Sequence, residues 1–205
     1  MDNFRSLKNK IILITGSSRG IGKKIATKFL ENGAVVIGVS KNKNLKKIIK
    51  TKNKYQHFFC DLSKNEDIQI TLKKIFKKYK KIDVLINNAG VTIENTNSQI
   101  KNINNFSTTI QINLIASYIF SSEIVKKMIK RKKGGTMINI SSIGGELGFP
   151  NNPAYISSES ALIGLTRSFA RDYGKYNINC NAVLPGYFKT DMNKKSLNNK
   201  SKRIK

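Results

Sequence analysis

Apolar residues follow two alternating patterns along the chain. Six short runs rich in β-branched and aromatic residues predict buried strands at residues 11–15, 34–39, 55–60, 83–87, 136–141 and 178–184. Between them, apolar residues three and four positions apart predict helices at 22–32, 68–79 and 104–132, and a further helix from residue 154. Strands that are apolar throughout are covered on both faces, so the alternation predicts an α/β fold with a parallel sheet between two layers of helices.

The chain is expected to form one domain followed by a basic tail. Its 205 residues fit a single domain, which we place at residues 1–192. Gly33 and Gly174 follow helical runs and are expected to end those helices. Residues 193–205 have few apolar side chains and dense positive charge, so we expect this tail to be disordered.

A glycine-rich segment, TGSSRGIG at residues 15–22, joins the first strand directly to the first helix. Gly16 permits the sharp turn, Gly20 lets the backbone approach a pyrophosphate, and Gly22 allows close packing of the helix. The start of a helix offers free N–H groups and partial positive charge, so the segment predicts a phosphate site rather than an ordinary glycine-rich turn. Other contacts to the phosphates are expected from Ser18, Arg19 and Ile21.

The end of the second strand indicates which dinucleotide is bound. An acidic residue there would hold the adenosine ribose hydroxyls and repel a 2′-phosphate, but this chain has Ser40 and Lys41. With no acid present, and with Arg19 and Lys41 able to pair with phosphate, NADP(H) is favoured over NAD(H). The sequence therefore predicts a Rossmann-type doubly wound sheet that binds NADP(H).

Several spaced motifs resemble the short-chain dehydrogenase/reductase family in the family's order, over nearly the whole chain. The glycines are spaced GxxxGxG, the form found in that family, and NNAG follows the fourth strand. The resemblance implies that Asp61 and Leu62 contact adenine, and that further cofactor contacts come from Asn88, Ala89, Gly90, Pro185, Gly186, Phe188 and Thr190. It also implies a seventh strand, which we do not find, so the sixth strand is expected to be an exposed edge.

The same resemblance implies the catalytic residues. Asn113, Ser142 and Tyr155 stand where the family has its Asn, Ser and Tyr. Hydride transfer to a carbonyl carbon leaves an alkoxide-like oxygen that needs a proton, which the hydroxyl of Tyr155 would supply if its pKa of about 10 is lowered. Ser142 would hydrogen-bond the carbonyl oxygen, and Asn113 would hold a water molecule in the proton path.

One catalytic position departs from the family pattern. The family has a lysine four residues after the tyrosine, which grips the nicotinamide ribose and lowers the tyrosine pKa, whereas this chain has Glu159. A negative charge there should raise the pKa of Tyr155 and slow proton transfer by a factor on the order of 10² to 10⁴. Glu159 can still accept hydrogen bonds from ribose hydroxyls, so cofactor binding is compatible with this residue.

Within the family, the motifs most resemble the 3-oxoacyl-(acyl-carrier-protein) reductases of fatty-acid biosynthesis. The resemblance implies an NADPH-dependent oxidoreductase that acts on a 3-oxoacyl group bound to acyl carrier protein, and a homo-oligomer (dimer or tetramer). The carrier is acidic, so a basic run could steer it if the run lies near the cleft. That run is Lys126, Lys127, Lys130, Arg131, Lys132 and Lys133. The alternative is a solvated helix end.

The net charge of +26 is the most unusual bulk property. It is compatible with nucleic acid, an anionic membrane or an acidic partner, but Lys, Asn and Ile make up 85 of the 205 residues, as expected from an A/T-rich coding sequence. The lysines are scattered, without the aromatic or Cys/His spacing of nucleic-acid binders, so we expect neither nucleic-acid nor membrane binding.

The remaining features indicate a cytoplasmic protein. We expect neither a signal peptide nor a membrane-spanning helix. Cys60 and Cys180 lack metal-ligand spacing and are expected to be reduced core residues, with no metal bound. Three hypotheses follow: a working ketoreductase, a catalytically impaired nucleotide-binding paralogue or truncated gene product, and, least supported, a nucleic-acid binder.

Overall fold

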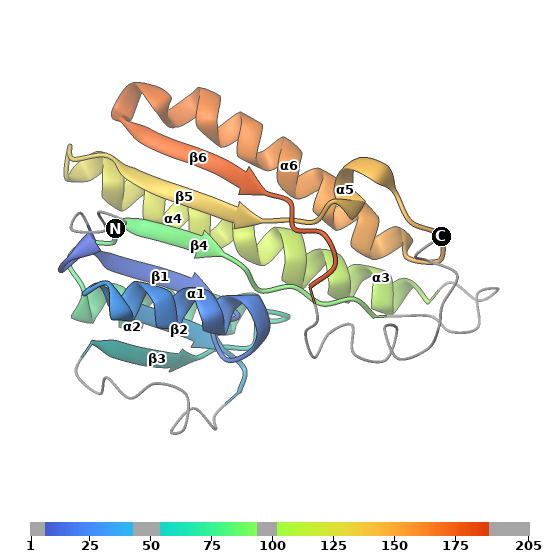
Figure 1. Cartoon of the computed structure of the whole chain (residues 1–205), viewed down its shortest axis with the longest axis horizontal. Coiled ribbons are helices and arrows are strands. Elements are labelled where there is room, and N and C mark those ends of the chain that lie inside the picture. Colours follow the sequence, from blue (N-terminus) through green and yellow to red (C-terminus); the bar gives the residue numbers. More distant parts are fainter. Residues whose placement is uncertain (1–6, 43–53, 94–101, 189–205) are drawn as a thin grey trace.

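The computed structural model describes residues 7–42, 54–93 and 102–188. These residues form a six-stranded parallel sheet in the order β3-β2-β1-β4-β5-β6 (Figure 1). The strands are β1 Ile11–Thr15, β2 Val35–Ser40, β3 Tyr55–Phe59, β4 Val84–Asn87, β5 Gly135–Ile140 and β6 Ile178–Val183. The sequence prediction of six strands is confirmed, with bounds that differ by no more than one residue at either end.

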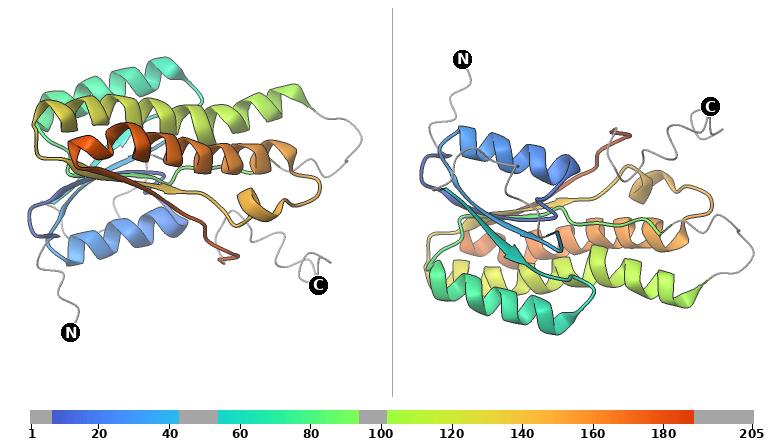
Figure 2. Two further views of the ribbon diagram at one scale, coloured as in Figure 1. Left: turned by 90° about the horizontal axis from the view of Figure 1, so that it is seen from above. Right: turned by 90° about the horizontal axis from the view of Figure 1, so that it is seen from below.

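Helices cover both faces of the sheet, as predicted. Helix α1 (Gly20–Glu31) lies on one face, while α2 (Asn65–Lys78), α4 (Ala116–Lys130) and α6 (Pro153–Tyr173) lie on the other (Figure 2). A short helix, α5 (Gly144–Leu147), follows β5 and was not predicted. Among the described helices, none combines the length and apolar character needed to cross a bilayer.

Alternate residues of the strands form separate cores on the two faces. In β1, Leu13 packs with the α2, α4 and α6 side, while Ile12 and Ile14 pack beneath α1 with Ala26 and Leu30. Both sets are buried, which is why the strands read as continuous apolar runs instead of alternating. Cys60 and Cys180 are buried and free, as expected.

The predicted helix at 104–132 is interrupted by a different helical geometry. It comprises α3 (Ile103–Ile110), a π-helical segment η2 (Gln111–Ile115) and α4, in one continuous right-handed path. Such a segment holds an extra residue per turn and often occurs at functional sites. It carries Asn113, one of the predicted catalytic residues.

The two predicted glycine stops differ in geometry. Gly33 has φ +82° and its N–H bonds to the carbonyl of Leu30, so it ends α1 as predicted. Helix α6 also ends before Gly174, but this glycine keeps a right-handed conformation and the chain continues into a 3-10 turn (η3, Gly174–Tyr176). The left-handed residue that turns the chain toward β6 is Asn177, with φ +58°.

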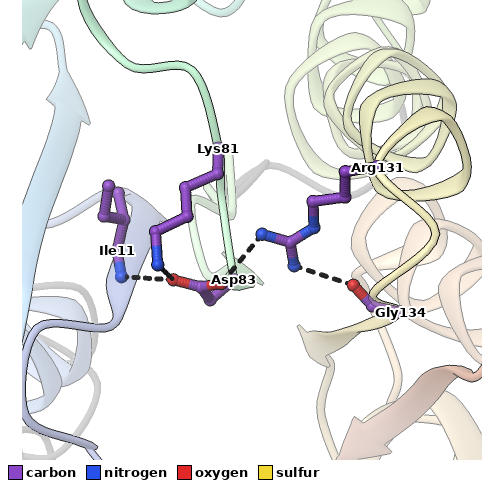
Figure 3. A network of polar contacts seen from close by, with 5 residues as sticks. All are labelled: Ile11, Lys81, Asp83, Arg131 and Gly134. Atoms are coloured by element: carbon purple, nitrogen blue, oxygen red, sulfur yellow. Dashed lines mark hydrogen bonds and ion pairs between the residues drawn. The ribbon is translucent and has the colours of Figure 1, made fainter.

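A largely buried carboxylate, that of Asp83, links the amino ends of three neighbouring strands. Asp83 accepts hydrogen bonds from the backbone N–H of Ile11 at 2.9 Å and from Arg131 at 2.8 Å, and it pairs with Lys81 at 3.2 Å (Figure 3). Arg131 also donates to the carbonyl of Gly134 at 2.7 Å. The start of β1, the start of β4 and the turn before β5 are thereby linked at one point.

Candidate active site

A cleft of about 500 Å³ opens at the carboxyl ends of the central strands. The strand order reverses between β1 and β4, where loops turn to opposite faces and leave a crevice. Most of the predicted site residues line it: Gly16, Ser18, Arg19, Gly20, Ile21, Gly22, Ser40, Lys41, Asp61, Leu62, Asn88, Ala89, Gly90, Tyr155 and Glu159. Six further lining residues were not assigned to the site by the sequence analysis: Asn42, Cys60, Val91, Ile112, Ile140 and Ser141.

The loop between β1 and α1 has the shape and electrostatics of a phosphate cradle. Gly16 and Gly20 have φ values of +68° and +54°, which favour glycine. A Cβ atom at Gly22 would overlap the carbonyl oxygen of Gly16 and the side chain of Asn88. No side chain caps the start of α1 and its first turn holds no acidic residue, so its N–H groups and positive helix end favour an anion. These residues fit a dinucleotide pyrophosphate.

A tyrosine from β3 supports this loop from below. The hydroxyl of Tyr55 lies 3.1 Å from Oγ of Ser17, a fully buried residue of the loop. The two hydroxyl groups meet over Gly38 of β2, where a Cβ atom would overlap both of them. Sequence reasoning missed this contact because the three residues belong to three different elements, and the only available signal was a glycine inside a predicted strand.

Charged and polar side chains gather at the end of the cleft formed by β2 and β3. Lys41 pairs with Asp61 at 2.6 Å, and Oγ of Ser40 lies 2.9 Å from Nε2 of His57. Burial would raise the pKa of Asp61, but hydrogen bonds from Lys41 and Ser63 outweigh it and hold that pKa below its ordinary value. The structure thus pairs Lys41, which the sequence analysis expected at the 2′-phosphate, with Asp61, which it expected at the adenine.

The segment after β4 is clamped to the phosphate loop. Oγ1 of Thr15 accepts hydrogen bonds from the backbone N–H groups of Asn88 and Ala89, at 3.0 and 3.1 Å. The side chain of Asn88 donates in return to the carbonyl of Thr15 at 3.0 Å. These bonds fix the two walls of the cleft relative to each other.

Tyr155 lines the opposite end of the cleft. It lies in the first turn of α6, where Pro153 starts the helix, and Ser142 is near enough to lower its pKa, although Ser142 is not among the residues that line the cleft. Desolvation by burial, and then the charge of Glu159, raise the pKa of Tyr155 to about 12, against the lowering effect of Ser142. The prediction that Glu159 raises this pKa agrees with the geometry, although burial is the larger cause.

Asn113 is locked by its neighbours. Its Oδ1 accepts from the N–H of Val91 at 2.9 Å, and its Nδ2 donates to the Val91 carbonyl and to Oγ of Ser158, both at 3.0 Å. Nδ2 also lies 3.5 Å from Oε1 of Glu159. Asn113 is buried and does not line the cleft, so it orders the residues around the cleft, and its expected contact with a water molecule stays a prediction.

Glu159 is a buried carboxyl group at the cleft wall. The residue is only 4% exposed, and Oε2 has no hydrogen-bond partner among the described residues. Burial raises the pKa of Glu159 to about 7, against a smaller lowering effect of the Ser141 hydroxyl. Unpartnered buried oxygens are rare in native proteins, so this atom points to a ligand.

Comparison with known proteins agrees with this geometry. The sequence model of the short chain dehydrogenase family matches residues 10–201. The chain belongs to the short-chain dehydrogenase/reductase family. A 3-oxoacyl-(acyl-carrier-protein) reductase from Rickettsia typhi is 39% identical to it over 195 residues, which cover 94% of this chain and 78% of the relative. The chain is thus an oxidoreductase of this family, as predicted.

Solved structures of other short-chain dehydrogenases/reductases share the fold. A 4-hydroxyisoleucine dehydrogenase complexed with NADH superposes with a TM-score of 0.87 and 35% identity, covering 94% of this chain and 79% of that one. ElxO with NADP bound gives a TM-score of 0.84 and 32% identity, covering 93% and 78%. Since the neighbours include both NADH and NADP complexes, the comparisons indicate a nicotinamide dinucleotide without deciding between the two.

Some residues that the family resemblance singled out lie away from the cleft. Pro185, Gly186 and Phe188 follow β6 and do not line it, and Phe188 is largely exposed. Thr190 and the tail at 193–205 fall outside the described residues. The cofactor contacts expected from these positions stay predictions.

The basic run at the end of α4 also lies away from the cleft. Arg131 is bound to Asp83 and Gly134, at the amino ends of the strands, whereas the cleft is at their carboxyl ends. Lys126 pairs with Glu123, and Lys127 lies over the ring of Phe76 at 5.0 Å. The run therefore does not meet the condition under which it could steer an acidic partner, nearness to the cleft, because it lies at the amino ends of the strands.

Proposed function

We propose that this protein reduces a 3-oxoacyl thioester carried by acyl carrier protein, with NADPH as the hydride donor. The observation that carries the proposal is the position of Tyr155 in the wall of a cleft that also holds a phosphate cradle, with Ser142 near enough to lower the pKa of the tyrosine. The pair offers a proton donor and an oxygen-binding group side by side, which is what carbonyl reduction requires.

The residues of the cleft divide among the parts of the cofactor. The start of α1 would hold the pyrophosphate, and Lys41 with Ser40 would receive a 2′-phosphate, where no acid opposes it. Lys41 must then be shared with Asp61, its present partner. When bound, NADPH supplies the hydride; the protein orients it and excludes water.

The proton comes from Tyr155. With its pKa near 12, the hydroxyl stays protonated at neutral pH, so the donor form is always present. The same high pKa makes it a weak acid, and proton transfer to the new alkoxide gains less driving force than from a tyrosine of ordinary pKa. Ser142 would hold the carbonyl oxygen beside this hydroxyl while the proton moves.

The second candidate function is that of an impaired paralogue, which binds the nucleotide but reduces substrate slowly or not at all. Glu159 favours it, because a buried carboxyl beside the tyrosine opposes proton release. An acyl-carrier substrate is proposed from relatives named as acyl-carrier-protein reductases, and a homo-oligomer only from the family resemblance.

The test is NADPH oxidation, followed at the nicotinamide absorbance band, with a 3-oxoacyl thioester as substrate. We expect slow but saturable oxidation, faster with NADPH than with NADH. Replacing Tyr155 by Phe should lower the rate at least 100-fold, the contribution typical of a general acid, while the affinity for NADPH changes little. A Tyr155→Phe variant with full activity, or reduction of other ketones only, would contradict the proposal.

A further inference from the structure

Glu159 offers an uncompensated negative charge to the end of the cleft where the nicotinamide would lie. The phosphate cradle is central, and the Lys41–Asp61 pair marks one end of the cleft, so Tyr155 and Glu159 stand at the other. Glu159 is 4% exposed as a residue, and no described lysine or arginine pairs with its carboxyl. A buried carboxylate without a partner is costly and is stabilised by any cation that enters its surroundings.

The two redox states of the cofactor differ in charge at this end. The oxidised nicotinamide ring carries a positive charge and the dihydronicotinamide ring is neutral, while the phosphates and adenosine are the same in both. We propose that Glu159 makes the site discriminate between these two states and bind NADP⁺ more tightly relative to NADPH than an uncharged residue would. The inference rests on the proposed function, since it requires a nicotinamide nucleotide in this cleft.

Such a preference would favour reduction of the substrate. When the hydride leaves the dihydronicotinamide for the carbonyl carbon, the ring gains the positive charge that the carboxylate stabilises. Glu159 would therefore have opposite effects on the two transfers. It would favour hydride transfer from the dihydronicotinamide and disfavour proton transfer from Tyr155. A tenfold stronger relative binding of the oxidised form corresponds to a potential of the bound couple lower by about 30 mV.

The effect should depend on pH, because only the ionised carboxyl discriminates. The groups that face Glu159 are Asn113 from η2, Ser141 after β5, and Tyr155 one turn earlier in α6. Tyr155, with its pKa near 12, stays neutral. In α5, which packs on the Glu159 backbone through Gly145, the charged residue Glu146 pairs with Arg167 on the surface. With a pKa of about 7, the Glu159 carboxyl should lose its charge in mildly acidic solution.

The experiment compares the dissociation constants of NADPH and NADP⁺ by fluorescence and calorimetric titration. The measured quantity is their ratio, in which contributions of the shared adenosine and phosphates cancel. At about pH 9 we expect the ratio Kd(NADPH)/Kd(NADP⁺) to be roughly tenfold higher in the wild type than in Glu159→Gln, a size typical of one charge a few ångströms away in a partly screened site. Near pH 5.5, well below the pKa of about 7, the two proteins should give the same ratio.

Glu146→Gln is the matched control, because it removes the same charge from a half-exposed position outside the cleft, and its ratio should equal that of the wild type. Equal ratios in the wild type and Glu159→Gln at high pH would overturn the inference. If that variant does not fold, a wild-type ratio that stays flat from acidic to basic pH overturns it equally. Binding of both nucleotides with an unchanged ratio would leave the proposed function standing, whereas no binding of either would overturn both.

Discussion

At the scale of single residues, the protein combines familiar groups with one reversed charge. Tyr155 lines the cleft and Ser142 is near enough to lower its pKa, while Gly16 and Gly20 of the phosphate loop have positive φ angles that favour glycine. Glu159 changes the electrostatics of this site: it raises the pKa of Tyr155 and leaves an unpartnered oxygen at the cleft wall. The sequence predicted the effect of Glu159 on the pKa of Tyr155, whereas the buried, unpartnered oxygen could be found only in the structure.

Tyr55 is a positioning residue whose role can be tested by removing one oxygen atom. In Tyr55→Phe, Ser17 loses its partner under the phosphate loop, and we expect the affinity for NADPH to fall about fivefold, equivalent to one hydrogen bond of about 1 kcal/mol. Binding of adenosine 2′,5′-bisphosphate, which lacks the pyrophosphate, should change little. Tyr176→Phe, at an exposed tyrosine, is the control. An unchanged NADPH affinity in Tyr55→Phe would show that the loop holds its shape without this bond.

At the scale of elements, strands were easier to predict than the details of helices. Each strand is an uninterrupted apolar run, because both of its faces are buried, and this signal is local. The π-helical segment around Asn113 has no such local signal in the sequence. Its Asn113 is bonded to Val91 and Ser158, which belong to other parts of the chain. The same holds for Asn177, which makes the turn that Gly174 was expected to make.

The Asp83 network gives a prediction about the stability of the sheet. Asp83→Asn should lower the free energy of unfolding by about 3 kcal/mol at neutral pH, because it leaves the largely buried Arg131 without its counter-ion. Glu123→Gln breaks an exposed pair and should have no measurable effect. Denaturant unfolding followed by circular dichroism measures both, and similar stabilities for the two variants would show that the network contributes little.

The pH dependence of this contribution follows from the pKa of Asp83. Burial would raise it, but the hydrogen bonds from Ile11, Arg131 and Lys81 outweigh burial and hold it below its ordinary value. The carboxylate therefore stabilises the fold at all pH values above the ordinary aspartate pKa of about 4, and this contribution is lost as the pH falls through the lower folded-state pKa. The difference between the wild type and Asp83→Asn should shrink in that acidic range.

At the scale of the whole molecule, the two ends of the strands have separate tasks. The carboxyl ends form the cleft, while Asp83 and Arg131 join the amino ends (Figure 3). The sequence predicted the cleft because the glycine-rich loop, Ser40 with Lys41, Asp61 with Leu62, and the segment 88–90 each lie at or just after the end of a strand. It could not place the basic run of α4 relative to the cleft, because that depends on the direction in which the helix crosses the sheet. Because the basic run does not lie near the cleft, we assign no binding partner to the net charge of +26.

The central claim is that a cleft with Glu159 in place of the family's lysine still transfers a hydride and a proton. A single-turnover experiment tests it most directly: the protein is saturated with one equivalent of NADPH, as judged by fluorescence, and mixed with excess 3-oxoacyl thioester while the nicotinamide absorbance is recorded. We expect a single exponential loss of absorbance that corresponds to one NADPH per chain. The rate should be slow, because Tyr155 is a weak acid. Saturated NADPH binding with no loss of absorbance would contradict it and leave a nucleotide-binding protein without reductase activity.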